Sequence, residues 1–422
     1  MTTNDRQESR PKEFKNRRVT KFELLLKLVF AAVLLASSAI LWTDLAQAQT
    51  QFFYSVVDNE TMPNGHKPKV IGDFANSGFS SVGAFTVGQG FKLYQYPNWT
   101  RHVISTHNNA DTAEDACVAD VNGDGALDIV IGGLSGITYW LENPLMQGLD
   151  PYNSEWVAHL IDSGHSSHDV VCRDVNNDQK IDIATDSGIY IQGATPDTWH
   201  FVGAPNINRT NQGTSLAKIC CNDQYLDLVA PYANGAELAW FENPLHHGGD
   251  LLNDTWAVHV IDARPGFIGD MTTTEGDFNQ DGSLDIAMAP MYNNGNLIWY
   301  EAPLHPIVNQ RWVMHIIGPA NFVHQGSVQA VDFDGDGLPD LGFVEQEQSN
   351  SRRIAIYFNA ASGASWTLDT LASTGGHNPK MGTIGNDALP SIFSANHGYN
   401  GFANPLELWR NQGSGRGGVP AK

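Results

Sequence analysis

The stretch DFDGDGLPD, residues 332–340, recurs along the chain as a nine-residue pattern, D-x-[DN]-x-D-G-x-x-D. Residues 120–128 (DVNGDGALD) and 277–285 (DFNQDGSLD) keep it in full, and residues 174–182 (DVNNDQKID) lose only the glycine. Acidic or amide side chains at alternate positions, followed by glycine, are typical of a cation-binding turn. Repetition of this turn predicts a repeat protein, so the 422 residues need not divide into two or three ordinary domains.

Three weaker copies of the turn complete the series. They lie at residues 73–81, 219–227 and 383–391, and the copy at 219–227 keeps only Asp223 and Asp227. The seven turns begin 45 to 58 residues apart, at residues 73, 120, 174, 219, 277, 332 and 383. This is the length of a four-stranded propeller blade. We therefore predict an all-β fold, a seven-bladed β-propeller of four-stranded blades with Asp-rich calcium turns.

Each unit contains the pattern of four strands. Apolar runs enter and leave the turn, as around residues 332–340, and a third, aromatic segment ends at proline, as in YWLENP at 139–144. A fourth segment, W-x-x-H-x-I as at 156–161, alternates with period two. The last unit stops after its third segment at 406–411, whereas 52–57 is a spare strand. We expect these two strands to pair and close the ring. The repeated histidines of the fourth segment are expected to be structural: His102, His159, His259 and His315.

The first 48 residues differ from the rest of the chain. A basic stretch precedes an apolar run from Leu28 to Trp42, and Ala46-Gln47-Ala48 is a small-x-small cleavage site. We expect a signal peptide over 1–48, the propeller over 49–412 and a flexible tail over 413–422. An uncleaved anchor is the alternative, although 15 apolar residues are short for a bilayer that needs roughly 20. The predicted location is secreted or periplasmic, with membrane contact only through an uncleaved segment.

Acidic residues dominate the chain after residue 48. Without the eight basic and five acidic residues of the first segment, 16 basic and 41 acidic residues remain, a formal charge of −25. Such a charge argues against nucleic acid as a partner. Because much of the acid lies in the turns, neutralisation by metal ions is expected.

The chain has four cysteines, Cys117, Cys172, Cys220 and Cys221. They are too few for a disulfide scaffold and lack the paired C-x-x-C spacing of a zinc site. An exported chain can form disulfides, and small buried core residues are the alternative. Their pairing stays open at this point.

Calcium is the structural ion that we expect in the four intact turns. It takes six to eight oxygen ligands in irregular geometry, which suits side chains at turn positions 1, 3, 5 and 9 with a carbonyl near position 7. An EF-hand is disfavoured, because strands rather than helices flank the turn. The predicted ligands are Asp120, Asn122, Asp124, Asp128, Asp174, Asn176, Asp178, Asp182, Asp277, Asn279, Asp281, Asp285, Asp332, Asp334, Asp336 and Asp340.

These turns make the units resemble FG-GAP or VCBS repeats, a family of calcium-binding propeller blades, over about residues 52–411. The W-x-x-H-x-I and ENP segments are also similar to the propeller domain of aldos-2-ulose dehydratases. The first resemblance implies a calcium-stabilised propeller. The second implies a lyase acting on a carbohydrate.

A second set of residues stands six positions before each turn: Lys67, Glu114, His168, Gly213, Met271, Gly326 and His377. Equivalent positions in a propeller are related by the ring axis, and the strand entering the turn is expected to be innermost. These residues are therefore predicted to surround one mouth of the central channel. Further histidines lie nearby in the sequence, at His66, His107, His165 and His324.

Imidazoles beside a carboxylate suit proton transfer or a transition metal at the mouth. No G-x-S-x-G, H-E-x-x-H, P-loop or dinucleotide motif supports another chemistry. We favour a lyase or dehydratase acting on a small polar or carbohydrate-like ligand, with His168 and His377 as acid, base or metal ligands and Glu114 or Lys67 assisting. Two alternatives stay open: a non-catalytic propeller that binds glycan or protein, and histidines that only bond to backbone and water.

Overall fold

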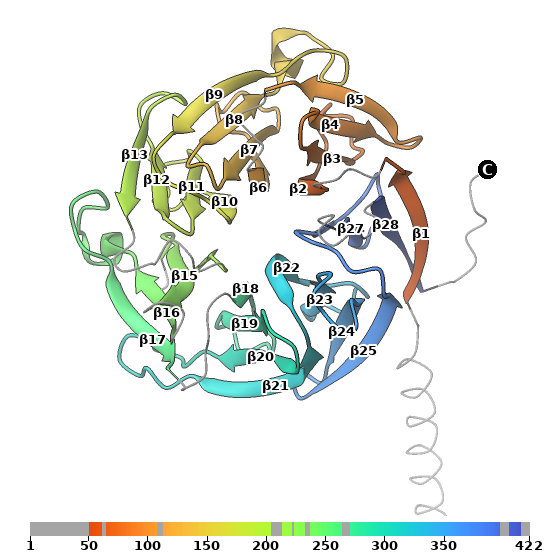
Figure 1. Ribbon diagram of the computed structural model, residues 1–422. Helices are drawn as coiled ribbons and strands as arrows, with labels where there is room; N and C mark the ends of the chain where they lie inside the picture. Colours follow the sequence, from red (N-terminus) through yellow and green to blue (C-terminus); the bar gives the residue numbers. More distant parts are fainter. Residues whose placement is uncertain are drawn as a thin grey trace, which may run out of the picture. The chain divides into compact units, whose positions relative to one another are not determined.

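The structure is a computed structural model, and it describes residues 50–60, 65–107, 113–203, 213–221, 223–232, 237–263, 271–396 and 405–414. Within these residues the strands form seven four-stranded antiparallel sheets around a central axis (Figure 1). The predicted seven-bladed propeller is therefore confirmed. The predicted signal segment lies outside the described residues, among which no helix is long and apolar enough to cross a bilayer.

The first six blades each consist of four consecutive strands, numbered outward from the axis. Blades 1 and 2 comprise β2 (His66–Gly72), β3 (Ser81–Thr86), β4 (Gly90–Gln95), β5 (Thr100–Ser105), β6 (Ala113–Ala119), β7 (Asp128–Gly133), β8 (Thr138–Glu142) and β9 (Val157–Asp162). Blades 3 and 4 comprise β10 (Val170–Arg173), β11 (Asp182–Thr185), β12 (Gly188–Gln192), β13 (Trp199–Gly203), β14 (Ser215–Ala217), β15 (Asp227–Tyr232), β16 (Glu237–Glu242) and β17 (Ala257–Asp262). Blades 5 and 6 comprise β18 (Met271–Gly276), β19 (Asp285–Pro290), β20 (Gly295–Glu301), β21 (Val313–Ala320), β22 (Val323–Val331), β23 (Asp340–Glu345), β24 (Ile354–Ala360) and β25 (Ser365–Ala372).

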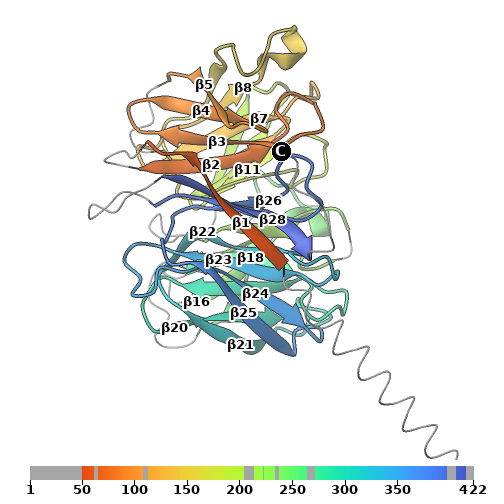
Figure 2. The same cartoon turned by 90° about the vertical axis from the view of Figure 1, so that its right-hand side faces the viewer.

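Blade 7 joins the two ends of the described chain. Its strands are β26 (Lys380–Gly382), β27 (Ser391–Ser394), β28 (Leu406–Ser414) and, on the outside, β1 (Thr50–Asp58). β1 runs antiparallel to β28, pairing Phe52 with Asn411 and Tyr54 with Trp409 (Figure 2). The predicted closure is confirmed, although β28 continues two residues past the expected boundary at 412, to Ser414.

The hydrophobic core lies between the faces of neighbouring blades. Middle strands are buried on both faces, so that all six residues of β7 and all six of β19 are buried. Outermost strands such as β9 contain only exposed and partly buried positions. Each fully buried Val, Leu, Ile or Phe stabilises the fold by about 1.5–3 kcal/mol relative to an exposed one. The blades are thus held by apolar contacts on both sides of each sheet.

The Asp at position 9 of each intact turn connects two parts of one blade. In blade 2, Asp128 Oδ2 accepts a hydrogen bond from Val121 N at 2.9 Å, and its Oδ1 accepts one from Asn143 N at 2.8 Å. The same two backbone bonds recur at Asp182, Asp285 and Asp340. Position 9 therefore fixes the turn to the end of the third strand.

The Asn of the ENP segment connects neighbouring blades. Asn143 Nδ2 donates to Phe74 O of blade 1 at 2.9 Å and to Leu127 O of its own blade at 3.0 Å. We call this bond to the preceding blade the amide staple. It recurs from Asn243 to Val175, from Asn359 to Phe278, from Asn411 to Phe333 and, with a glutamine, from Gln192 to Val121. The acceptor is always the residue at position 2 of the preceding turn.

Replacing Asn143 with Ala should therefore destabilise the propeller. The change leaves two buried carbonyl groups without their donor, at a cost of about 1–3 kcal/mol. Asn153→Ala is the control, because Asn153 is exposed and its side chain donates to Asp150 within one loop. Denaturant unfolding of both variants measures the difference, and equal stabilities would show that the staple contributes nothing.

Histidines of the outer strands make one repeated set of contacts. His159 stacks on Trp140 with ring centroids 4.3 Å apart, and its Nε2 lies 2.9 Å from Glu142 Oε2. The same stack and bond join His259 to Trp240 and Glu242, and His315 to Trp299 and Glu301. These contacts explain why Trp, Glu and His repeat together in the sequence.

All four cysteines are paired. Cys117 on β6 and Cys172 on β10 form a disulfide between blades 2 and 3. Cys220 and Cys221, adjacent in the sequence, form the second disulfide within the degenerate turn of blade 4.

Candidate functional site

Lys67 and Glu114 meet at the centre of the ring. Lys67 is on β2 and Glu114 on β6, the innermost strands of blades 1 and 2 (Figure 1). Lys67 Nζ lies 2.5 Å from Glu114 Oε1, and the two residues are only 6% and 4% exposed. Burial raises the pKa of Glu114 above its usual range, although Lys67 and His168 oppose this. A carboxylate and an ammonium group are thus held in a poorly solvated place.

His168 stands just before β10, the innermost strand of blade 3. Its backbone N donates to Asp186 Oδ1 at 2.7 Å, and its ring Nδ1 lies 3.8 Å from Asp186 Oδ2. Burial alone would lower the pKa of His168, but the Asp186 carboxylate, with smaller contributions from Glu114 and Asp169, raises it above the ordinary value. This environment favours the charged imidazolium.

His377 and His324 pack ring against ring. Their centroids are 4.3 Å apart, and both residues are buried. Burial, together with the nearby charge of His168, lowers the pKa of His324 to about 3, so that this imidazole is neutral near pH 7. Its Nδ1 has no hydrogen-bond partner among the described residues.

The sequence register placed Gly326 at the mouth and named His324 only as a histidine nearby in the sequence. The pairing of β22 with β23 shifts between Val323 and Val328, and Gly326 within this irregularity has φ 60°. This irregular strand brings His324, two residues before the expected position, against His377. Of the other neighbouring histidines, His107 and His165 contact Tyr139 and Phe201, respectively. The side chain of His66 lies outside the described residues.

Several further polar residues surround this group and were not predicted. Lys69 is fully buried and donates to Lys67 O at 2.9 Å and His377 O at 2.7 Å. Burial lowers the pKa of Lys69 to about 7. Asn378 Nδ2 donates to Glu114 O at 2.5 Å. The sequence could have predicted Lys69 at this site, because it stands two residues after Lys67 and residues at this spacing share one face of a strand.

A cavity of about 170 Å³ lies along the inner strands, lined by residues adjacent in sequence to Glu114 and His168 but not by these two residues themselves. It is lined by polar side chains that include Asp115, Asp169, Thr273, Glu275 and Lys380. Lys380 Nζ is 2.9 Å from Asp115 Oδ1, and burial raises the pKa of Asp169 to about 7. At about 30 Å³ for each water molecule, the space suits a handful of waters or a ligand of few heavy atoms.

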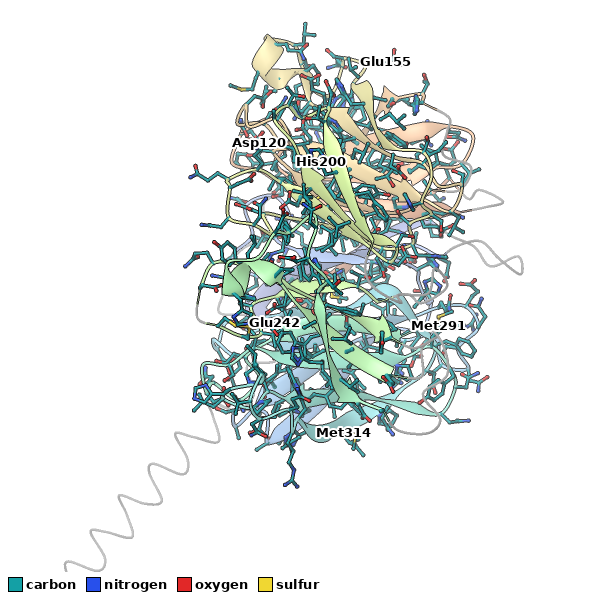
Figure 3. All side chains as sticks on the ribbon, turned by 90° about the vertical axis from the view of Figure 1, so that its left-hand side faces the viewer. Asp120, Glu155, His200, Glu242, Met291 and Met314 are labelled. Carbon is teal, nitrogen blue, oxygen red and sulfur yellow. A yellow bond between two sulfur atoms is a disulfide. The ribbon has the colours of Figure 1, made fainter. Side chains whose placement is uncertain are left out.

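The predicted calcium ligands gather at the opposite end of the inner strands. In Figure 3, Asp120, the first residue of a turn, and Met291, in the loop between β19 and β20, lie toward opposite faces of the ring. Carboxylate oxygens of Asp332, Asp334 and Asp336 lie within 4.8 Å of one another. Lys67, Glu114, His168 and His377 each stand six residues before the first residue of a turn, so they lie at the other end of the inner strands from these turns.

The donor set of each intact turn fits a calcium ion. In blade 2, Asp120 and Asn122 accept backbone N–H bonds that curl the turn, so that its carboxylate and amide side chains gather on one short loop. Burial raises the pKa of Asp128 to about 7, and the charges of Asp124 and Asp120 add to this effect. Crowded carboxylate and amide oxygens of this kind suit a hard cation with irregular coordination. The sequence analysis predicted the Asp at position 9 only as a calcium ligand and did not predict its hydrogen bonds to the backbone.

Metal-ligating atoms of three or more residues come within 4.8 Å of one another in two places among the described residues. One is the turn at Asp332, and the other is Cys220, Cys221 and His246. The mouth histidines do not form such a group, so a transition metal at the mouth stays a prediction.

Comparison with known proteins agrees with the fold. Residues 277–343, which contain the turns of blades 5 and 6, match the model of the FG-GAP-like repeat family. The chain is thus a seven-bladed β-propeller with FG-GAP-like repeats, which confirms the resemblance seen in its turns. No curated protein matches the chain.

Solved structures with a similar fold include an ancestral GH74 enzyme, with a TM-score of 0.55 and 10% identity, covering 85% of this chain and 49% of that one. This chain therefore spans about half of the GH74 chain. An exotype rhamnogalacturonan lyase has a TM-score of 0.48 and 12% identity, covering 86% and 76% of the two chains. BBS1N, in complex with ARL6DN, has a TM-score of 0.49 and 10% identity, covering 85% and 96%. At these identities the similarity concerns the fold alone.

Proposed function

We propose that this chain is an exported, calcium-stabilised propeller that acts as a lyase or dehydratase on a small polar or carbohydrate-like ligand at the mouth of its channel. The group of Lys67, Glu114, His168, His324 and His377 carries the proposal. Burial of ionisable groups costs free energy that a purely structural ring does not require. Ionisable side chains with perturbed pKa values gather preferentially at functional sites.

The two histidine environments supply opposite halves of an elimination. His168, beside Asp186, favours the protonated form, whereas the ring of His377 packs against the neutral His324. A protonated imidazole suits a general acid, and the second imidazole at the same mouth is available as a general base. His168 is therefore the proposed acid and His377 the proposed base.

The reaction balances with these groups alone. His377 takes a proton from the carbon next to a carbonyl group, a carbon–carbon double bond forms, and the neighbouring carbon–oxygen bond breaks. His168 gives its proton to the departing oxygen, which leaves as water. Proton exchange with solvent restores both rings. Lys67, paired with Glu114, offsets the negative charge that develops on the carbonyl oxygen.

A non-catalytic binding propeller is the second candidate, and the internal pairing of charges favours it. Lys67 pairs with Glu114, and Lys380 pairs with Asp115. A site that only binds would keep such pairs intact. In this case a small polar molecule would bind at the mouth without turnover.

Replacing either His168 or His377 with Ala tests the catalytic proposal. Turnover should fall by about 10²- to 10⁴-fold, because each ring moves a proton in the reaction. The candidate substrates are a panel of monosaccharides, keto sugars and uronic acids. Turnover is measured by the ultraviolet absorbance of the conjugated product. Calcium-dependent stability should stay nearly unchanged, since neither residue belongs to an intact turn.

The control variant is His259→Ala, which removes the stack on Trp240 and the bond to Glu242 and should affect stability alone. In the wild type, the rate should fall at high pH with an apparent pKa above about 6.5, because the raised pKa of His168 sets the loss of its proton. Mouth variants with lower stability but unaltered specific activity in the folded fraction would refute the catalytic roles. Binding by calorimetry without turnover would favour the second candidate.

A further inference from the structure

The turn of blade 4 has lost the features of a calcium site. Its first three positions are Ile219, Cys220 and Cys221, so that no acidic or amide ligand stands at positions 1 and 3. In the intact turns, positions 4 and 6 have positive φ, as at Asn177 and Gln179. Among the described residues of the blade 4 turn, the positive φ is at position 3, where Cys221 has φ 72°. The Cys220–Cys221 disulfide, at positions 2 and 3, thus lies in a turn that lacks these oxygen ligands and follows a different backbone path.

His246 enters this turn from the short 3-10 helix η2 (Pro244–His247). Its Nδ1 lies 2.7 Å from Asp223 Oδ2 and its Nε2 lies 2.9 Å from Asp227 Oδ1, and its side chain is fully buried. Burial alone would lower the pKa of His246, but Asp227 and Asp223 raise it to about 9. In the disulfide form the turn therefore holds an imidazolium between its two remaining carboxylates.

Blade 2 provides an internal comparison for His246. Its helix η1 (Pro144–Gln147) follows the same E-N-P-L sequence and begins at an Asn cap in the same way. The residue equivalent to His246 is Met146, which is 56% exposed, and the turn of blade 2 keeps all its acidic and amide positions. The inward imidazole thus occurs in the blade that has two cysteines in place of the calcium ligands.

Sulfur and nitrogen ligands are already close together here. One ligand atom each from Cys220, Cys221 and His246 lies within 4.8 Å of the other two. A groove of about 830 Å³, lined by both cysteines and by residues 303–308, borders the turn. Two sulfurs and an imidazole held by a carboxylate are the ligands that Zn²⁺ prefers, and the carboxylate orients the ring.

We propose that reduction of the Cys220–Cys221 disulfide converts this turn into a binding site for Zn²⁺ or a similar thiol-binding ion, with Cys220, Cys221 and His246 as ligands. The fourth position is taken by a water molecule from the groove or by a carboxylate of the turn. The disulfide closes the site, so that metal binding depends on the redox state. This site is separate from the channel mouth and does not rest on the function proposed there.

The reduction step needs a dithiol as the electron donor. One sulfur of the dithiol attacks the disulfide and its second sulfur completes the exchange, so that the dithiol leaves as a cyclic disulfide and both cysteines become thiols. Each thiol releases its proton to solvent when it binds the ion. His246 releases the proton of the nitrogen that coordinates, and the carboxylate at the other nitrogen keeps its hydrogen bond.

Cobalt titration of the full chain tests this proposal, because Co²⁺ bound to thiolates gives a charge-transfer band in the near ultraviolet. The protein is reduced with a dithiol, the dithiol is removed under anaerobic conditions, and the reduced protein is titrated with Co²⁺. We expect a band that saturates at one ion per chain in the reduced protein and no band in the oxidised protein. Oxygen ligands of the calcium turns cannot produce this band.

Three variants locate the site. The double variant Cys220→Ser/Cys221→Ser should lack the band, whereas Cys117→Ser/Cys172→Ser should keep it. His246→Met, which introduces the residue of blade 2, should weaken Co²⁺ binding by about tenfold or more. Circular dichroism reports whether each reduced protein retains its β-structure. The proposal is overturned by a reduced, folded protein without the band, by a band that survives in the Cys220→Ser/Cys221→Ser variant, by unchanged affinity in His246→Met, or by unfolding on reduction alone.

Discussion

Removal of calcium is expected to lower the melting temperature of the propeller by roughly 10 °C or more. An ion that binds only the folded state at a thousandfold excess over its Kd contributes about 4 kcal/mol, and four intact turns are available. Without the ions, each turn holds crowded carboxylates that repel one another, as at Asp332, Asp334 and Asp336. Thermal unfolding in calcium and in excess chelator, with the metal content measured in parallel, gives the result.

Two variants make this test specific. The double substitution Asp332→Ala/Asp336→Ala removes one turn and should reduce the effect of the chelator by about a quarter, because the four distant sites add. Asp73→Ala is the matched control. Asp73 begins the turn of blade 1, which has Ala75 and Ser77 at positions 3 and 5, and it accepts bonds from the N–H groups of Ser77 and Gly78. The Asp73→Ala substitution should change the melting temperature by the same amount with and without calcium. An unchanged melting temperature in calcium-free protein would refute the structural role of the ion.

Deletion of residues 49–60 should prevent the formation of a stable, soluble ring. β28 would lose the strand with which it pairs, which leaves an open edge with unpaired N–H and C=O groups. The deletion also removes Asp58 and Glu60, which accept hydrogen bonds from Tyr94 and Lys92 of blade 1. We expect aggregation and loss of the cooperative unfolding transition, measured by light scattering and calorimetry.

Neighbouring residues of β1 supply a milder form of the same test. Phe52 contacts Phe333 with ring centroids 6.1 Å apart, whereas Phe53 is 51% exposed. Phe52→Asp should destabilise the ring by about 3 kcal/mol or more, because it places a charge against the core. Phe53→Asp should change stability by less than about 0.5 kcal/mol. Equal behaviour of the two variants, or a soluble and stable deletion protein, would show that β1 does not hold the ring closed.

The architecture was predictable because one local pattern repeats. A turn that needs carboxylates at fixed positions, as in residues 332–340, marks the register of each blade, and the spacing of the turns then sets the fold. The same register located Lys67 and Glu114 on adjacent inner strands, where they form an ion pair. Local chemistry that repeats can be read from the chain without knowledge of long-range contacts.

The remaining parts of the site depend on departures from the repeat. His324 reaches His377 through an irregular stretch of β22, whereas the repeat register placed Gly326 at the mouth. Asp128 accepts hydrogen bonds from backbone groups that lie 7 and 15 residues away. The sequence shows that the residue is acidic but does not show these bonds. The pairing of Cys220 with Cys221 likewise depends on the folded turn, because the sequence alone left the pairing of the four cysteines open.

The amide staples also divide the ring into unequal arcs. Blades 2, 3 and 4 each carry a staple to the blade before, as do blades 6 and 7. Blades 1 and 5 have Tyr96 and Ala302 at the equivalent position, and neither residue has a side-chain amide to reach back to the preceding blade. The joint between blades 4 and 5 therefore depends on apolar packing without this polar link. A circularly permuted chain that begins at blade 5 would keep both stapled arcs whole, because its new termini would fall at this joint.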